Sequence, residues 1–247
     1  MRNIWTIAKR EYDHYFVSPI AYVVAFTILL VLGIVFWVIL SQAIQYASYG
    51  GDAPGISSIT GSFAFLLVLS APALTKRLLA DENRMGTMEL LLTAPVRDSE
   101  LIIGKWLGGL LFVLTIVAIT LVYPIILNNL VEPGIDQGAM LTAYVGLILV
   151  AASFLAIGVG VSAIFTNQVA AFFVTMIILV ILWWLIGFPA DYVQAGGDVF
   201  RYLDMQSHYY NSLGAGKINV TDLAYFFSLI AVGLFTGTMA VETRRWR

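Results

Sequence analysis

The side chains that could take part in chemistry or recognition gather in one polar segment, residues 81–106, which reads DENRMGTMELLLTAPVRDSELIIGKW. Long apolar stretches flank it on both sides. Within it, Gly86 can turn the backbone and Thr87 can cap a short helix. Glu89 then falls in the first turn, where negative charge is favoured. The pattern predicts a short capped helix between two apolar segments.

This helix has two different faces. Met88, Leu91 and Leu92 recur at helical spacing and form an apolar stripe, while Glu89 lies on another face. Pro95 ends the helix. The pattern leaves three interpretations open: a solvated loop, a helix that rests on lipid, and an element on which a cytoplasmic motor docks. Only the docking element uses both faces.

The chain has no set of residues that could form a catalytic or metal centre by itself. It contains no cysteine, and its two histidines, His14 and His208, lie outside the apolar segments. Asp204 and His208 stand one helical turn apart and could share a metal, but a lone histidine beside tyrosines is more typical of an interfacial anchor. We expect no catalytic residue, no metal site and no cofactor site.

A nucleotide site is not expected either. The nearest approach to a phosphate loop, IIGKW at 102–106, lacks the first glycine and the hydroxyl residue after the lysine. No acidic, basic or histidine residue lies in the apolar interior of these segments, which disfavours ion-coupled carriers and proton relays. Any energy from ATP must therefore be supplied by a partner.

Composition indicates an integral membrane protein. The 247 residues are 60% hydrophobic and only 11% charged, well outside the range of soluble domains. The 13 basic residues are spread along the chain rather than clustered, so nucleic-acid binding is not expected.

Six apolar segments are long enough to cross a bilayer. We predict an all-α, single-domain membrane protein over 1–247, with an extracytoplasmic loop at 189–221. The predicted transmembrane helices cover 21–40, 62–79, 107–127, 140–165, 169–188 and 223–241.

The positions of Lys and Arg predict the orientation. With the N-terminus in the cytoplasm, eleven of the 13 basic residues lie on the inner side, and only Arg201 and Lys217 lie outside. This bias predicts that both termini are cytoplasmic.

Residues 1–18 predict an amphipathic helix in the membrane interface. Trp5 and Tyr12 belong to its apolar stripe, whereas Lys9 and Arg10 can meet anionic lipid. Ser18-Pro19 ends it and starts the first span, with Ser18 as the cap. A disordered tail is the alternative.

Small residues recur at four-residue spacing in several spans, a pattern typical of close helix packing. Packing within one chain is the simpler interpretation, and packing between chains stays open. The sets are Gly104 with Gly108, Ala152 with Ala156 and Gly160, and Gly233 with Gly237.

The stretches EYDHYFVSPIAYVV, ADENRMGTMELLLTAPVRDSELIIGKW, FLAIGVGVSAIFTNQVAAFF and ETRRWR resemble the permease subunits of type-2 ABC transporters. The resemblance covers the chain in order and is closest to the GldF group, named for gliding motility. The permeases of nitrous-oxide-reductase maturation are more distantly similar.

The resemblance implies that segment 81–100 is the coupling helix that docks on an ABC ATPase subunit, which binds ATP and Mg²⁺. It implies a second, identical or related permease copy and a membrane-anchored extracytoplasmic partner. The expected location is the cytoplasmic membrane of a prokaryote. Carried over residue by residue, the docking positions are Asp81, Glu82, Arg84, Gly86, Thr87, Met88, Glu89 and Leu91.

The cargo is not specified by the sequence. Spans whose polar residues are Ser, Thr, Asn and Gln fit an amphipathic or lipid-like cargo, or a machine that transmits force. We therefore expect an ATP-driven permease, with a non-transporting scaffold that drives an extracytoplasmic process as the alternative.

Overall fold

Helices make up all the regular structure in the described part of the chain. The structure is a computed structural model that describes residues 2–47, 55–85, 96–132, 134–192 and 196–245. This confirms the all-α class. The helices are α1 (Arg2–Tyr15), α2 (Pro19–Ala47), α3 (Ser57–Thr75), α4 (Ala80–Met85), α6 (Asp98–Thr120), α7 (Val122–Leu130), α8 (Gln137–Ile164), α9 (Gln168–Val180), the π-helix η1 (Ile181–Leu185), the 3₁₀ helix η2 (Phe188–Asp191), α10 (Gly197–Leu203), α11 (Met205–Tyr210), the 3₁₀ helix η3 (Leu213–Ala215) and α12 (Val220–Arg245).

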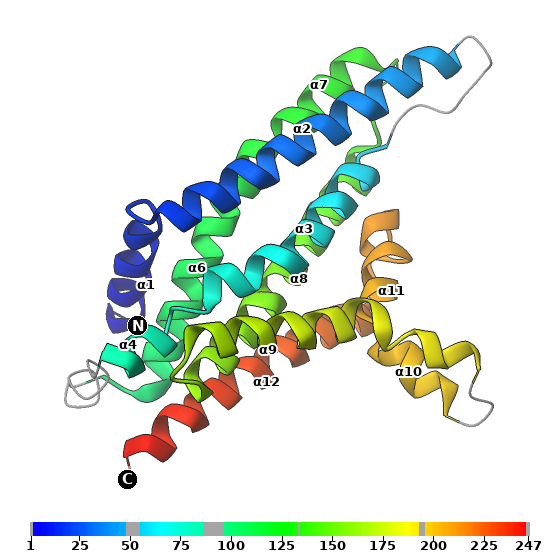
Figure 1. Cartoon of the computed structure of the whole chain (residues 1–247). Helices are drawn as coiled ribbons and strands as arrows, with labels where there is room; N and C mark the ends of the chain where they lie inside the picture. The colour runs from blue at the N-terminus through cyan, green and yellow to red at the C-terminus, as the bar shows by residue number, and fades with distance from the viewer. Residues whose placement is uncertain (1, 48–54, 86–95, 133, 193–195, 246–247) are drawn as a thin grey trace.

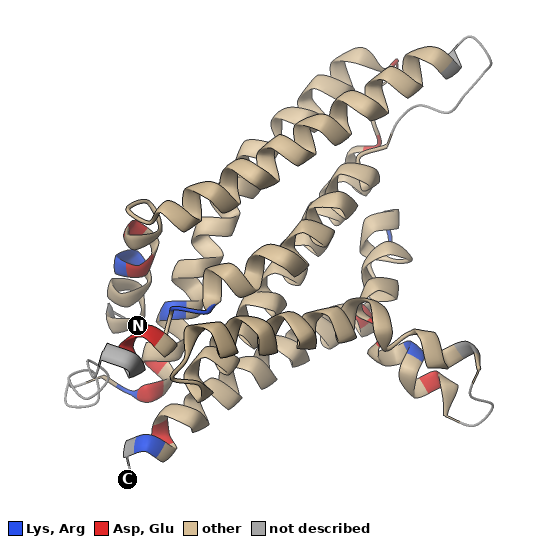
Figure 2. Ribbon diagram, viewed as in Figure 1, with Lys and Arg blue, Asp and Glu red and all other residues tan. Residues whose placement is uncertain are grey.

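Six candidate membrane spans occur in the described residues, in the predicted order. They cover Pro19–Gln45, Ser57–Glu82, Asp98–Leu130, Gln137–Ile164, Gln168–Ala190 and Val220–Arg244. Both chain termini lie at one end of the bundle (Figure 1), which we call the terminal end. Most of the charged residues gather there, and the long helices are almost free of charge (Figure 2). This arrangement is what an even number of crossings produces.

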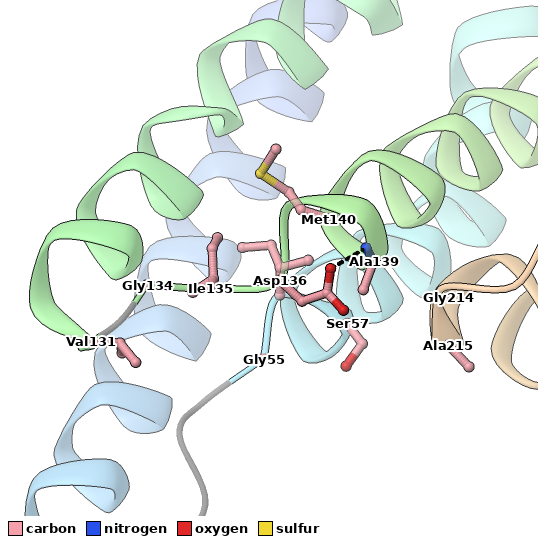
Figure 3. Close-up of a pocket in the computed structure, with 11 residues that line it drawn as sticks. Gly55, Ser57, Val131, Gly134, Ile135, Asp136, Ala139, Met140, Gly214 and Ala215 are labelled. Carbon is pink, nitrogen blue, oxygen red and sulfur yellow. Dashed lines mark hydrogen bonds between the residues drawn. The ribbon is translucent and has the colours of Figure 1, made fainter.

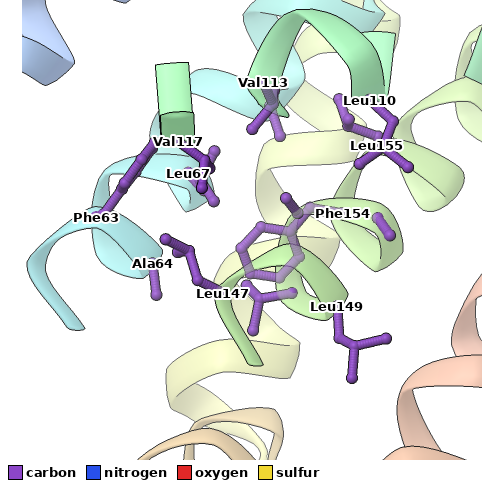
Figure 4. Close-up of a cluster of buried hydrophobic side chains, with 14 of the residues drawn as sticks. Phe63, Ala64, Leu67, Leu110, Val113, Val117, Leu147, Leu149, Phe154 and Leu155 are labelled. Atoms are coloured by element: carbon purple, nitrogen blue, oxygen red, sulfur yellow. The ribbon is translucent and has the colours of Figure 1, made fainter. Parts of the chain in front are cut away.

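Helix α8 is the centre of the bundle, and it is the most deeply buried of the candidate spans. It contacts α3, α6, α9 and α12. Phe63 of α3 and Val113 of α6 are buried in the same apolar cluster as Leu147 and Phe154 of α8 (Figure 4). The cluster holds the spans around one central helix.

Helices α8 and α12 cross with their backbones in contact. A Cβ on Gly233 would lie 2.6 Å from the carbonyl carbon of Ala156, and one on Gly160 would lie 2.6 Å from the Gly233 carbonyl oxygen. Only glycine allows such an approach. For this pair of helices, the small-residue pattern packs within one chain.

The third span is broken into two helices at a proline. Pro124 has no N–H to donate to the carbonyl four residues earlier, that of Thr120, and its ring crowds that carbonyl. Helix α6 ends at Thr120 and α7 follows from Val122. The released Thr120 carbonyl accepts a hydrogen bond from the Tyr144 hydroxyl at 3.0 Å. Helix α8 therefore satisfies the backbone group that Pro124 leaves open.

Helix α2 begins where the sequence places it. Pro19 is the first helical residue, and the Ser18 carbonyl accepts from the Ala21 N–H at 3.1 Å, so Ser18 stands at the cap position. The Ser18 hydroxyl accepts a hydrogen bond from Arg77 Nη1 at 2.6 Å. A guanidinium that leaves the end of α3 is a stronger partner for this hydroxyl than a backbone N–H. Ser18 therefore joins α2 to α3.

The backbone contact between α8 and α12 predicts opposite effects for two Gly→Ala variants. Gly233→Ala should lower the free energy of unfolding by roughly 1–3 kcal/mol, because its Cβ meets backbone that cannot move aside. Gly33→Ala is the matched control: its Cβ would have only the Tyr123 Oη nearby, at 3.6 Å, and alanine favours the helix. Thermal unfolding in detergent measures both, and equal melting temperatures would contradict the close crossing.

Candidate functional site

The structure describes both flanks of the predicted docking segment. Asp81 and Glu82 lie on α4, and α6 begins the return into the bundle at Asp98. Arg84 also lies on α4, where its backbone is described and its side chain is not. The remaining docking positions lie outside the described residues: Gly86, Thr87, Met88, Glu89 and Leu91.

A buried ion cluster joins the two flanks. Lys105 of α6 is 1% exposed, and its Nζ lies 2.9 Å from Glu82 Oε1 of α4 and 2.9 Å from Glu11 Oε1 of α1. A buried ammonium is tolerated only when it is paired and hydrogen-bonded. Two carboxylates from different helices meet that requirement here. Glu82, expected at the ATPase contact, has this carboxylate oxygen engaged with Lys105.

Arg10 balances the charge of the cluster. Its Nη2 lies 2.9 Å from Glu11 Oε1 and 3.8 Å from Glu82 Oε1, so two cations face two anions. Burial by itself raises the pKa of Glu11, but the Lys105 ammonium and the Arg10 guanidinium outweigh it and hold the pKa below its usual value. Glu11 is therefore ionised at neutral pH, as the pairing with Lys105 requires.

Two glycines allow Glu11 to reach Lys105. A Cβ on Gly108 would lie 2.6 Å from Glu11 Cβ and 2.8 Å from the Ala8 carbonyl oxygen. One on Gly104 would lie 2.8 Å from Ile7 Cβ. The Gly104 and Gly108 pair thus seats α1 against α6 of the same chain. Packing between copies is not the role of this pair in the described structure.

Further hydrogen bonds fix α1 along its length. Asn3 Nδ2 donates to Glu100 Oε2 at 3.1 Å, near the start of α6. At the other end, Tyr15 donates to the Leu74 carbonyl of α3 at 3.0 Å. The predicted N-terminal helix is confirmed, and it packs on α6 and α3 rather than standing alone. Its depth in a bilayer remains a prediction.

The predicted interfacial residues lie on the outer part of α1. Trp5 is 57% exposed, and Lys9 and Arg10 are also exposed. Tyr12 is half-buried because its hydroxyl is 3.1 Å from Thr115 Oγ1 of α6. The amphipathic helix therefore turns Ala8 and Tyr15 inward and its tryptophan and lysine outward.

The α4 flank is also held from the opposite side. Ser162 Oγ, at the end of α8, accepts hydrogen bonds from the backbone N–H groups of Leu79 and Ala80 at 3.1 Å each. Gln168, at the start of α9, donates to Asp81. Asp81 thus fixes α4 to the turn between α8 and α9. Through these bonds and the ion cluster, α4 is held to α1, α6, α8 and α9.

In the region after the fifth span, His208 packs against α12. His208 Nδ1 lies 2.6 Å from Asp222 Oδ1 of α12, and His208 Nε2 lies 2.8 Å from the Tyr202 carbonyl oxygen. The imidazole also stacks on Tyr225, with ring centroids 4.2 Å apart. His208 therefore fastens α11 to α12.

Asp204 lies at the start of α11. Its Oδ1 accepts from the Gln206 N–H at 3.2 Å and so caps α11, and burial raises the pKa of this carboxyl. The described residues contain no group of three His, Cys, Asp or Glu side chains that could hold a metal ion.

A hollow of about 300 Å³ lies between the start of α3, the start of α8 and η3 (Figure 3). Its acidic group, Asp136, has Oδ1 turned to the N-terminus of α8, 2.8 Å from the Gly138 N–H and 3.0 Å from the Ala139 N–H. The carboxylate acts as the N-cap of α8. The charge of this hollow is thus explained by the fold.

Sequence reasoning missed Glu11 and Lys105 as a pair. Lys105 counted toward the inner basic residues and as the lysine of the rejected phosphate loop, and Glu11 was not selected. A usable signal was present: Lys105 lies between Gly104 and Gly108, inside a motif for close helix packing. A lysine in such a contact is buried and needs an acidic partner on the helix that packs there.

Removing the buried ammonium should destabilise the terminal end. In Lys105→Met, the Glu11 and Glu82 carboxylates face each other without their main counter-ion, and we expect a loss of about 3 kcal/mol of unfolding free energy. Thermal unfolding in detergent measures it. The triple variant with Glu11→Gln and Glu82→Gln should recover most of the loss. Lys217→Met, at an exposed lysine, is the control, and identical stability of both single variants would refute the cluster.

The His208 contacts predict a local effect. His208→Phe keeps an aromatic ring beside Tyr225 but removes both hydrogen bonds, one of them to a carboxylate, so α10 and α11 should open more readily by about 1–3 kcal/mol. Hydrogen exchange over 197–219 measures this opening. His14→Phe, at an exposed histidine of α1, should leave exchange there unchanged. Unaltered protection in both variants would exclude the fastening role.

The comparison with protein families gives one match. Residues 5–240 match the family model described as ABC-2 family transporter protein. The search of curated proteins found no match.

Proposed function

The chain belongs to the ABC-2 family of transporter proteins, and on this premise we propose that it is a permease subunit that docks on a separate ABC ATPase through segment 81–100. A membrane component of an ABC transporter is not catalytic by itself. In this proposal the ATPase partner binds ATP and Mg²⁺, and two permease copies form the translocation pathway.

The observation that carries the proposal is the buried ion cluster of Glu11, Glu82 and Lys105. It joins α4 and α6, the two flanks of the segment, to α1. Ser162 and Gln168 hold α4 from the other side. A force applied to α4 would therefore reach α1, α6, α8 and α9 through these contacts. A passive loop needs no such anchoring.

The proposed orientation places the terminal end in the cytoplasm. Both termini and most charged residues lie there (Figures 1 and 2), and eleven of the 13 basic residues belong to the side assigned to the cytoplasm. A basic excess marks cytoplasmic loops. The segment then faces the compartment that contains ATP, in the cytoplasmic membrane of a prokaryote.

We extend the proposal to the GldF-like group on the motifs quoted above. A membrane-anchored extracytoplasmic partner would then complete the complex. The α10–α11 region, fastened to α12 by His208, is the part of the described chain that would meet this partner at the end opposite the termini. ATP-dependent flux in vesicles distinguishes a permease from a scaffold that transmits force.

Charge reversal at Glu89 tests docking. In Glu89→Lys, opposed charge should weaken contact with the ATPase, and we expect the stimulation of ATP hydrolysis by the permease to fall roughly tenfold, about 1.4 kcal/mol of coupling. Membrane insertion and thermal stability should be unchanged. ATPase assays of the reconstituted complex measure the loss.

Glu132→Lys is the matched control for the docking test, because Glu132 is an exposed glutamate on the loop after α7, at the end opposite the termini. It should retain full stimulation. If Glu89→Lys also retained full stimulation, the assignment of segment 81–100 to the ATPase contact would be wrong.

A further inference from the structure

A groove runs between the outer face of α1 and the apolar part of α6. Its volume is about 550 Å³. Helix α6 lines it with Leu111, Leu114 and Ala118, which recur at helical spacing and make an apolar wall. Helix α1 lines it with Lys9 and Asp13, two exposed side chains of opposite charge one turn apart. The groove therefore has an apolar part and a charged part.

The polar groups of Tyr12 and Thr115 lie between the apolar part and the charged part of the groove. The Tyr12 hydroxyl and Thr115 Oγ1 lie 3.1 Å apart and satisfy each other, so no bare polar group interrupts the wall there. Trp5, 57% exposed, lies one turn before Lys9 on the same face of α1. Tryptophan in this setting is typical of headgroup depth in a bilayer. An apolar wall below a charged rim has the polarity of a phospholipid.

We propose that this groove binds a phospholipid with an ethanolamine headgroup. The Lys9 ammonium would meet the phosphate, the Asp13 carboxylate would meet the headgroup ammonium, and an acyl chain would lie along Leu111, Leu114 and Ala118. The charges of Lys9 and Asp13 sum to zero, which matches a zwitterionic headgroup better than an anionic one. A primary ammonium can also donate hydrogen bonds to a carboxylate, and a quaternary one cannot.

The bound lipid would support the ion cluster from outside. Lys9 and Asp13 face the groove, while Glu11, between them in sequence, faces Lys105. A lipid that spans α1 and α6 would favour the arrangement in which Glu11 reaches Lys105. The inference uses the membrane location of the chain and does not require the docking of an ATPase.

Lipid titration of the purified full chain, followed by native mass spectrometry, tests the proposal. The probes are dioleoyl phosphatidylethanolamine, phosphatidylcholine and phosphatidylglycerol. The wild type should bind the ethanolamine lipid about three- to fivefold more tightly than either other lipid, the range expected for an exposed ion pair. Asp13→Asn should remove the preference for the ethanolamine lipid over phosphatidylcholine. Lys9→Met should weaken the binding of all three lipids.

Asp198→Asn is the matched control, because Asp198 is fully exposed on α10 and away from the groove. It should leave all three affinities unchanged. Equal affinity of the wild type for the three headgroups, a preference for phosphatidylglycerol, or an Asp13→Asn variant that keeps its preference would each overturn the proposal. The measurement contains no ATPase or nucleotide, so these outcomes leave the docking proposal to be judged by Glu89→Lys.

Discussion

The Lys105 ammonium, enclosed by the bundle, is the constraint on which the terminal end depends. An ammonium that is 1% exposed must be paired, and its two acidic partners come from α1 and α4. To satisfy it, α1 must lie against α6, which requires the bare backbone at Gly104 and Gly108. It also requires α4, at the start of the polar segment, to stay beside α6. One charge thus fixes the position of three helices.

In the middle of the bundle, close contacts between helices hold the structure together without charged groups. Gly160 and Gly233 bring the α8 and α12 backbones together. Where Pro124 opens the third span, the Tyr144 hydroxyl replaces the missing backbone partner at Thr120. In a membrane no water is available to satisfy such a carbonyl, so a side chain from the central helix must do it. Helix α8 contacts α3, α6, α9 and α12 because it is the most deeply buried of the candidate spans.

The spans and the amphipathic helix could be predicted because their signals are local. Twenty apolar residues in a row indicate a transmembrane helix whatever surrounds them, and the periodicity from Ile4 to Phe16 indicates a two-faced helix. Which side chains pair with one another was harder to predict from the sequence. Ser18 stands at the predicted start of α2, but the sequence did not indicate that Arg77 binds its hydroxyl. His208 was expected to be an interfacial anchor, and its pairing with Asp222 on another helix could not be read from the sequence.

By itself, the sequence determined that this chain crosses a membrane in six helices, that an amphipathic helix precedes the first, and that a polar segment separates the second and third. These properties follow from hydropathy and helical period, which act over neighbouring residues. Only the tertiary structure decided that Lys105 joins Glu11 and Glu82, which lie 94 and 23 positions away. The reason is physical: the pairing depends on which helix faces the bare Gly104 and Gly108 surface, and that is settled when the helices pack.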